Sequence, residues 1–143
     1  MTEQGRVLGV DFGDSRTGTA LSDPGRMLSG ALVCIRGGMQ TAATETARLA
    51  KENGAVRIVV GLPKNMDGTE GFRAERVRAF CELLQKETTL PVETYDERLS
   101  TVEAHRMMSM TGTFGRKRKE QVDNLSAQII LQDWLDRERN RKA

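Results

Sequence analysis

The chain has 143 residues, of which 38% are hydrophobic and 29% charged, and this composition is typical of a soluble globular domain that folds without disulfides or a structural metal. The absence of any run of about 18 apolar residues excludes a transmembrane helix, and the N-terminus lacks the apolar stretch of a signal peptide, so we expect a cytoplasmic protein without membrane contact. The formal net charge of +2 argues against binding of a polyanion by the whole surface, so any positive charge that holds phosphate must be local.

The first part of the chain is predicted to form three strands. The segments 6–12, 17–22 and 28–35 have the apolar runs of strands, and turn residues separate them at 13–15 and 23–25. Strands joined by such short links pair antiparallel.

Helices and strands alternate in the middle of the chain. A helix is predicted at about 41–53, with Gly54 as its stop, and a second helix has an apolar stripe around Phe80. Strands are predicted at 56–62 and 91–97, and strands joined by helical crossovers pair parallel. The sequence therefore predicts one α/β domain, residues 1–143, with a mixed five-stranded sheet of three antiparallel and then parallel strands, flanked by helices.

The C-terminal part is predicted to be helical around one basic loop. A capping box at 100–103 (Ser-Thr-Val-Glu) begins one helix, and a long helix follows at about 120–139. The segment 111–119 between them has two glycines and no apolar periodicity, so we expect a mobile loop. It contains the adjacent cations Arg116, Lys117, Arg118 and Lys119. Their mutual repulsion suggests an anionic partner, with solubility alone as the alternative.

Acidic residues stand at the ends of two predicted strands. Asp11 is near the end of a buried strand, where a carboxylate is unfavourable unless it is hydrogen-bonded, paired or bound to a cation. It could instead cap the turn at Gly13 or pair with Arg16. Asp96 and Glu97 close the fifth strand, and because side chains alternate, only one of them can readily join Asp11. A plain surface turn is the alternative there.

A third acid lies on the inward face of the last helix. Asp123 shares its stripe with Ala127, Ile130, Leu131 and Trp134, although a favourable position near the helix dipole is another explanation. Three carboxylates brought together repel one another and need a cation. Carboxylate oxygens are the ligands that Mg²⁺ and Mn²⁺ prefer. A zinc site is not expected, because the sequence has no cluster of histidines and cysteines: His105 is the single histidine, and Cys34 and Cys81 are far apart and expected to be reduced, buried thiols.

Four blocks of the sequence resemble one known family. They are residues 9–13 (Gly-Val-Asp-Phe-Gly) with Arg16, Gly18 and Ala20; residues 59–68 (Val-Val-Gly-Leu-Pro-Lys-Asn-Met-Asp-Gly); residues 96–101 (Asp-Glu-Arg-Leu-Ser-Thr); and residues 123–127 (Asp-Asn-Leu-Ser-Ala) with 130–132 (Ile-Leu-Gln). Together they resemble the YqgF family, also called RuvX-like, whose members are described as Holliday junction resolvases and are linked to maturation of pre-16S ribosomal RNA. The second block is the most specific, and Ser126, where the family often has alanine, is a small departure.

The resemblance implies a ribonuclease H-like fold with catalytic, metal-binding carboxylates at Asp11, Glu97 and Asp123. We therefore expect a nuclease that uses two Mg²⁺ or Mn²⁺ ions, with Asp11 bridging both, to hydrolyse phosphodiester bonds of ribosomal precursor RNA or branched DNA. The expected substrate-binding residues are Arg16, Lys64, Asn65, Arg98, Arg116, Lys117, Arg118 and Lys119.

Two other classes of function compete with a nuclease. An ATPase of the actin and sugar-kinase type also has an Asp-x-Gly motif in its first strand, but that architecture needs two such domains and 143 residues have room for one. A non-catalytic nucleic-acid-binding module in transcription or ribosome assembly stays open as the alternative, and so does the choice between a monomer and a homodimer.

Overall fold

The computed structural model of the chain describes residues 4–99 and 116–142, with the side chains of Leu99, of residues 116–123 and of Lys142 outside the description. The capping box predicted at 100–103 and the helix after it, which includes His105, lie outside the described residues. In chain order the elements are the strands β1 (Arg6–Asp11), β2 (Arg16–Ser22) and β3 (Ser29–Arg36), the helix α1 (Met39–Glu52), the strand β4 (Ala55–Leu62), the helix α2 (Phe72–Glu87), the strand β5 (Val92–Asp96), the short 3-10 helix η1 (Glu97–Leu99) and the long helix α4 (Arg116–Lys142).

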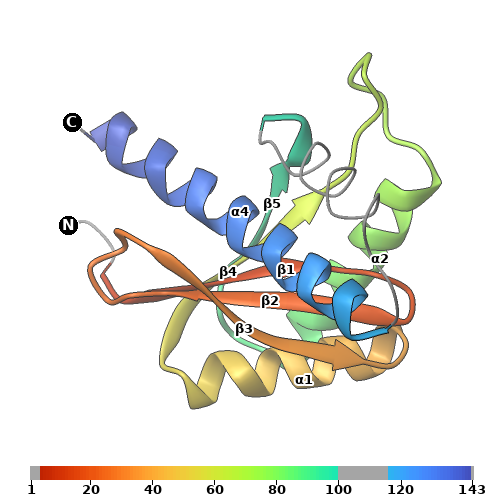
Figure 1. The fold of residues 1–143 in the computed structure, drawn as a ribbon, viewed down its shortest axis with the longest axis horizontal. Coiled ribbons are helices and arrows are strands. Elements are labelled where there is room, and N and C mark those ends of the chain that lie inside the picture. The colour runs from red at the N-terminus through yellow and green to blue at the C-terminus, as the bar shows by residue number, and fades with distance from the viewer. Residues whose placement is uncertain (1–3, 100–115, 143) are drawn as a thin grey trace.

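The strands form one mixed sheet in the order β3-β2-β1-β4-β5 (Figure 1). β2 is antiparallel to both β1 and β3, whereas β4 is parallel to both β1 and β5. The predicted pairing is therefore confirmed. Because β1, β4 and β5 run in the same direction, all three end at one edge of the sheet.

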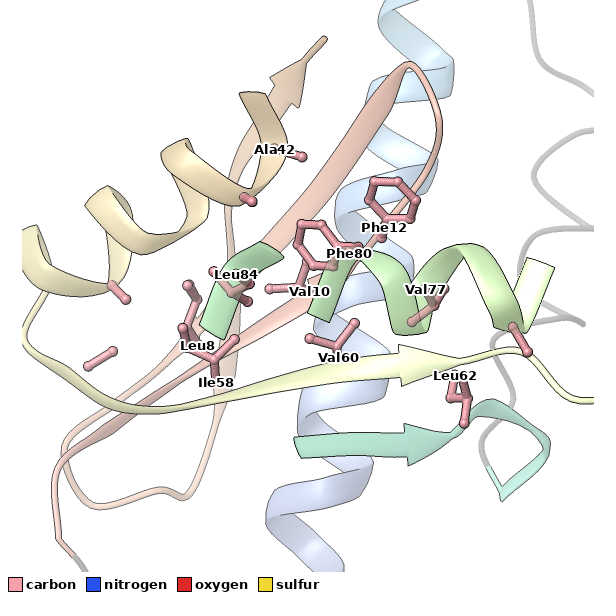
Figure 2. Close-up of a cluster of buried hydrophobic side chains, with 14 residues drawn as sticks. Leu8, Val10, Phe12, Ala42, Ile58, Val60, Leu62, Val77, Phe80 and Leu84 are labelled. Atoms are coloured by element: carbon pink, nitrogen blue, oxygen red, sulfur yellow. The ribbon is translucent and has the colours of Figure 1, made fainter. Parts of the chain in front are cut away.

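Alternating side chains divide the core into two layers. One face of β1 and β4, which includes Leu8, Val10 and Ile58, packs against α1 and α2 (Figure 2). The other face, which includes Val7 and Val59, packs against α4. The contacting residues of α4 are Ala127, Ile130, Leu131, Trp134 and Leu135, and the predicted stripe is among them. Residues of β1 in phase with Val7 therefore lie under α4.

Helix α4 rests directly on the backbone of β1. A Cβ atom added to Gly9 would lie 2.7 Å from Cβ of Leu131, so only glycine allows this approach. The helix is also tied to the antiparallel strands, because the amide of Thr19 donates to Oδ1 of Asn124 (3.4 Å) and the amide of Ser29 donates to Oε1 of Gln132 (2.9 Å). These contacts fix where the helix lies over the sheet.

The expectation of a basic loop at 116–119 was wrong, because α4 begins at Arg116 and includes all four cations. From 116 to 142 the sequence has no glycine or proline, and arginine, lysine, glutamate and glutamine all favour helix. Intrinsic propensity thus outweighs the repulsion of adjacent cations. None of the described helices, α4 included, is long and apolar enough to cross a membrane.

Candidate active site

Asp11 is the last residue of β1 and lies on the face covered by α4. It is in phase with Val7 and Gly9, and only 5% of its surface is exposed. The prediction that this carboxylate ends a buried strand is confirmed. A carboxylate at so low an exposure must be compensated by polar partners or a cation.

Glu97 is the first residue of η1, directly after β5, and is 3% exposed. Its side chain lies against Gly61 of β4, where an added Cβ atom would be 2.8 Å from Oε1 of Glu97 and 2.5 Å from Cδ1 of Ile130. Any larger residue at position 61 would displace either the carboxylate or the helix. Gly61 thus makes the space that Glu97 occupies.

The sheet register brings Asp11 and Glu97 toward each other. Val10 pairs with Val60, so Asp11 and Gly61 are each one residue further along neighbouring parallel strands. Gly61 in turn pairs with Tyr95 of β5, two residues before Glu97. Two buried carboxylates therefore gather at the shared edge where the parallel strands end, on the same face of the sheet.

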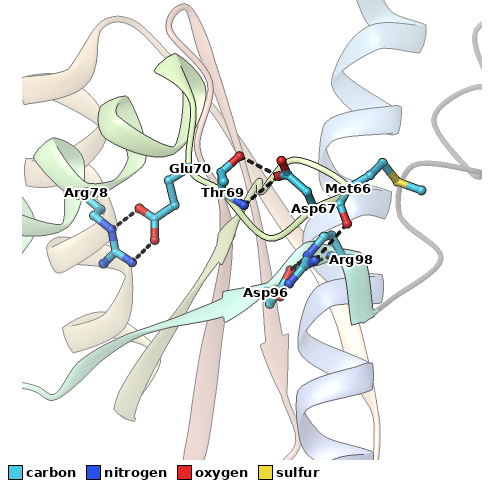
Figure 3. Close-up of polar contacts among 7 residues, drawn as sticks. All are labelled: Met66, Asp67, Thr69, Glu70, Arg78, Asp96 and Arg98. Atoms are coloured by element: carbon cyan, nitrogen blue, oxygen red, sulfur yellow. Dashed lines mark hydrogen bonds and ion pairs between the residues drawn. The ribbon is translucent and has the colours of Figure 1, made fainter.

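Asp96 points away from this pair. It forms an ion pair of 2.7 Å with Arg98, whose Nη1 also donates to the carbonyl oxygen of Met66 at 3.3 Å (Figure 3). The guanidinium of Arg98 lowers the pKa of Asp96 below its usual value, and Asp96 in turn raises the pKa of Arg98. Of the two adjacent acids, Asp96 is thus engaged by Arg98, and Glu97 is the buried one that lies on the same face as Asp11.

Other residues predicted for the site are placed less directly. The backbone of Asp123 is part of α4, but its side chain lies outside the described part of the chain. The same holds for the four cations at the start of that helix. Arg16 begins β2 and is partly buried. Among the described residues there is no group of three or more possible metal ligands of the His, Cys, Asp or Glu type. Cys34 and Cys81 are free, as predicted, but only partly buried.

Lys64 and Asn65 lie in the loop between β4 and α2, which its own hydrogen bonds hold in shape. The amide of Asn65 donates to the carbonyl oxygen of Thr69 (2.8 Å). The carboxylate of Asp67 accepts from the amide (3.0 Å) and hydroxyl (2.6 Å) of Thr69, as Figure 3 shows. These bonds from Thr69 lower the pKa of Asp67. Gly68 adopts a positive φ of 90° that completes the turn.

A groove of about 630 Å³ lies between this loop and the start of α2, and Glu97 forms part of its wall. A smaller cleft of about 110 Å³ on the side of Asp14 and Arg76 also borders Glu97. The residues lining the larger groove are Pro63, Lys64, Asn65, Met66, Gly71, Phe72, Arg73, Ala74, Glu97 and Arg98. Sequence reasoning missed Phe72 and Arg73, although Phe72 falls outside the apolar stripe of its helix and could have been noticed for that reason.

The chain is similar to known proteins over most of its length. The family model described as RuvX, Holliday junction resolvase, matches residues 5–137. A protein of Clostridium novyi (strain NT) named "Putative pre-16S rRNA nuclease" is 44% identical over 92% of this chain and 98% of its own length. A protein of the same name from Chloroflexus aggregans is 41% identical over 98% of this chain and 99% of its own length.

A solved structure of low sequence identity has the same fold. RuvC of T. thermophilus, in complex with a Holliday junction substrate, is 13% identical and superposes with a TM-score of 0.59 over 95% of this chain and 96% of that one. The fold is ribonuclease H-like, as expected from the sequence. The chain belongs to the RuvX family, described as Holliday junction resolvases, and is a nuclease that hydrolyses phosphodiester bonds.

Proposed function

We propose that Asp11, Glu97 and Asp123 are the catalytic residues of this nuclease and that they hold divalent ions, Mg²⁺ or Mn²⁺. We propose further that its substrate is a precursor of 16S ribosomal RNA. The observation that carries the proposal is the pair of buried carboxylates, Asp11 and Glu97, on one face at the carboxyl edge of the sheet. Gly61 keeps free the space in which the carboxylate of Glu97 lies.

The backbone of α4 supports the inclusion of Asp123. A Cβ atom on Gly9 would lie 3.2 Å from the carbonyl oxygen of Ala127, so this turn of the helix is above Gly9. Asp123 is one turn earlier, about 6 Å along the helix axis. Asp11 is two residues further along β1, about 6.6 Å, on the same face. Since the amide of Thr19, which pairs with Val10, donates to Asn124, the helix runs toward the end of β1 in this direction.

The donor set fits a hard divalent ion. Asp11 and Glu97 offer carboxylate oxygens, which Mg²⁺ and Mn²⁺ prefer, and Asp123 would add a third. When bound, a pair of such ions activates the attacking water and stabilises the leaving oxygen. The chain's own contribution is to hold the carboxylates in fixed positions under α4, where water has little access.

The surrounding cations and the amide side chain of Asn65 are suited to hold the backbone of the substrate rather than to read its bases. Lys64 and Asn65 are presented by the stiff loop between β4 and α2, and Arg98 is oriented by Asp96. Contacts of this kind set the position of a nucleic acid but not its sequence. Arg16 and the residues at 116–119 would extend this contact beyond the groove.

Precursor RNA is preferred because the relatives with more than 40% identity over nearly the whole chain carry that function in their names. Branched DNA is the second candidate, because the family description names Holliday junctions. Action on ribosomal precursors would take place in the cytoplasm.

The deciding experiment compares cleavage of precursor RNA with cleavage of a four-way DNA junction in the same buffers, with Mg²⁺, with Mn²⁺ and with chelator. We expect RNA cleavage that requires metal and is lost in Asp11→Asn. Preferential cleavage of the junction would assign the second substrate. Cleavage of neither, at protein concentrations where both are bound, would support the non-catalytic alternative.

A further inference from the structure

We propose that the groove beside Glu97 binds an unpaired nucleotide by stacking its base on the ring of Phe72. The inference rests on the proposed function and adds to it a preference in substrate structure. The nucleotide next to the cleaved bond would have to be unpaired, either in a single-stranded segment or turned out of a nucleic-acid duplex.

Two large apolar side chains are exposed on this groove. Phe72 is 72% exposed and Met66 is 94% exposed, and both line its wall. In contrast, the apolar side chains that follow in the same helix, Val77, Phe80 and Leu84, are all buried. Phe72 therefore contributes little to the core, and the ring face that it offers is available to a ligand.

Two cations of the groove are available to the same ligand. Arg76 and Arg78 of α2 are engaged by Asp14 and Glu70, respectively. Arg73, which precedes them in the helix, and Lys64 across the groove form no ion pair within the described ranges. Arg98, the third cation of the groove wall, is engaged by Asp96, so Arg73 and Lys64 are the two that a ligand can recruit.

An aromatic face flanked by cations is the arrangement by which proteins bind single-stranded nucleic acid. Bases stack on the ring while the cations contact the backbone, and the stacking tolerates any base because each has a π face. Inside a regular duplex each paired base is covered on both faces by its neighbours, so an internal base pair cannot stack on Phe72. Because Glu97 is part of the same wall, the stacked base would be close to the phosphate that is cleaved.

The test measures binding without cleavage, in chelator, to two labelled RNAs: a hairpin with a single-stranded extension and the same hairpin with a blunt end. Phe72→Ala should weaken binding of the extended hairpin by about tenfold and that of the blunt hairpin, which exposes base faces only in its loop and at its terminal pair, much less. Phe72→Trp should restore binding. Arg73→Gln should lower the dependence of log K on log salt for the extended hairpin by about 0.7.

Leu28→Ala is the matched control, because Leu28 is 70% exposed and lies in the turn between β2 and β3, away from the groove. It should bind both RNAs like the wild type. Equal binding of the extended hairpin by Phe72→Ala and the wild type would overturn the inference while the nuclease proposal stands. An equal loss on both hairpins would also overturn it, because Phe72 would then be a general contact that does not depend on an unpaired base. A wild type that binds neither RNA would remove the proposed function itself.

Discussion

At the scale of single residues, the site is defined by two acids that the fold buries close to one edge of the sheet, where a carboxylate is energetically unfavourable. Asp11 is 5% exposed and Glu97 is 3% exposed, and both have the same sign of charge at one edge of the sheet. Their repulsion is a cost that folding must bear in the absence of a cation. Because of this cost, removing one charge should affect the free energy of unfolding and the cleavage activity differently, and this difference distinguishes a functional role from a structural one.

The substitution Asp11→Asn should therefore leave the free energy of unfolding in metal-free buffer unchanged or raise it, while cleavage falls to background. Glu52→Gln is the control, because Glu52 is an exposed acid that forms a surface ion pair with Arg48 on α1, away from the site, and its loss should change neither quantity much. Denaturant unfolding and a cleavage assay measure the two effects. A large loss of stability in Asp11→Asn would identify Asp11 as a structural partner.

Gly61→Ala should both destabilise the protein and reduce cleavage. The added Cβ atom would lie 2.5 Å from Ile130 and 2.8 Å from Glu97, and overpacking of this kind costs typically about 1–3 kcal/mol. Gly30→Ala is the same change in strand β3, where an added Cβ atom meets nothing within 4 Å. Thermal unfolding of the two variants should separate them clearly, and equal behaviour would mean that the helix adjusts without cost.

The pair Asp96–Arg98 predicts a pH dependence. Arg98 lowers the pKa of Asp96 in the folded protein, so the pair stabilises the fold at pH values above the ordinary aspartate pKa of about 3.9, and this stabilisation is lost as the pH falls through the lower, folded value. In Arg98→Gln the pKa of Asp96, followed by NMR titration, should rise toward the ordinary value. An unchanged pKa would show that the local backbone, and not Arg98, is responsible.

At the scale of elements, the sequence was sufficient where periodicity and turn chemistry agree. The mixed sheet of three antiparallel strands followed by parallel strands was predicted correctly, as were the apolar stripes of α2 and α4, whereas the order of the strands in the sheet is known only from the structure. The start of α4 was not predicted correctly, because a run of like charges was given more weight than the helix propensity of the same residues. Whether a segment is loop or helix depends on the elements before and after it, which pattern alone does not supply.

This corrected start makes the basic run more informative. Four cations occupy the first positions of α4, at the positive end of the helix dipole, where each is unfavourable by about 0.3–1 kcal/mol. Replacing all four with glutamine, which keeps the helix propensity, should leave thermal stability unchanged or raise it. It should also lower the salt dependence of binding to double-stranded substrate by about 0.9 for each phosphate that these cations neutralise in the wild type.

The control for the place of the lost cations is glutamine at Lys51 and Lys86, in the last turns of α1 and α2, which removes two positive charges where the fourfold variant removes four. Binding titrations at several salt concentrations should show the original slope for this control. An unchanged slope in the fourfold variant would mean that the basic run takes no direct part in holding phosphate.

At the scale of the whole molecule, the site depends on contacts between parts of the chain that are far apart in sequence. Asp11 and Glu97 could be nominated from strand ends and alternation, and the resemblance pointed to the same residues. The role of Gly61 and the exposure of Phe72 could not be predicted, because both depend on how closely α4 and the loop at 63–71 approach the sheet. Only the packed fold contains that information.

The same dependence predicts that metal stabilises the entire fold. Asp11, Glu97 and Asp123 can share ions only when β1, η1 and α4 are assembled, so metal binds the folded state alone. At a free metal concentration one hundred times Kd, this binding favours the folded state by about 2.7 kcal/mol. Tm should therefore rise by several degrees. Asp11→Asn should begin from an equal or higher Tm without metal, because one repulsive charge is gone, but should gain much less from Mg²⁺ or Mn²⁺. The two curves of Tm against metal concentration should therefore cross or converge. Sodium chloride at matched ionic strength is the control for screening, and a parallel rise in both proteins would place metal binding elsewhere on the molecule.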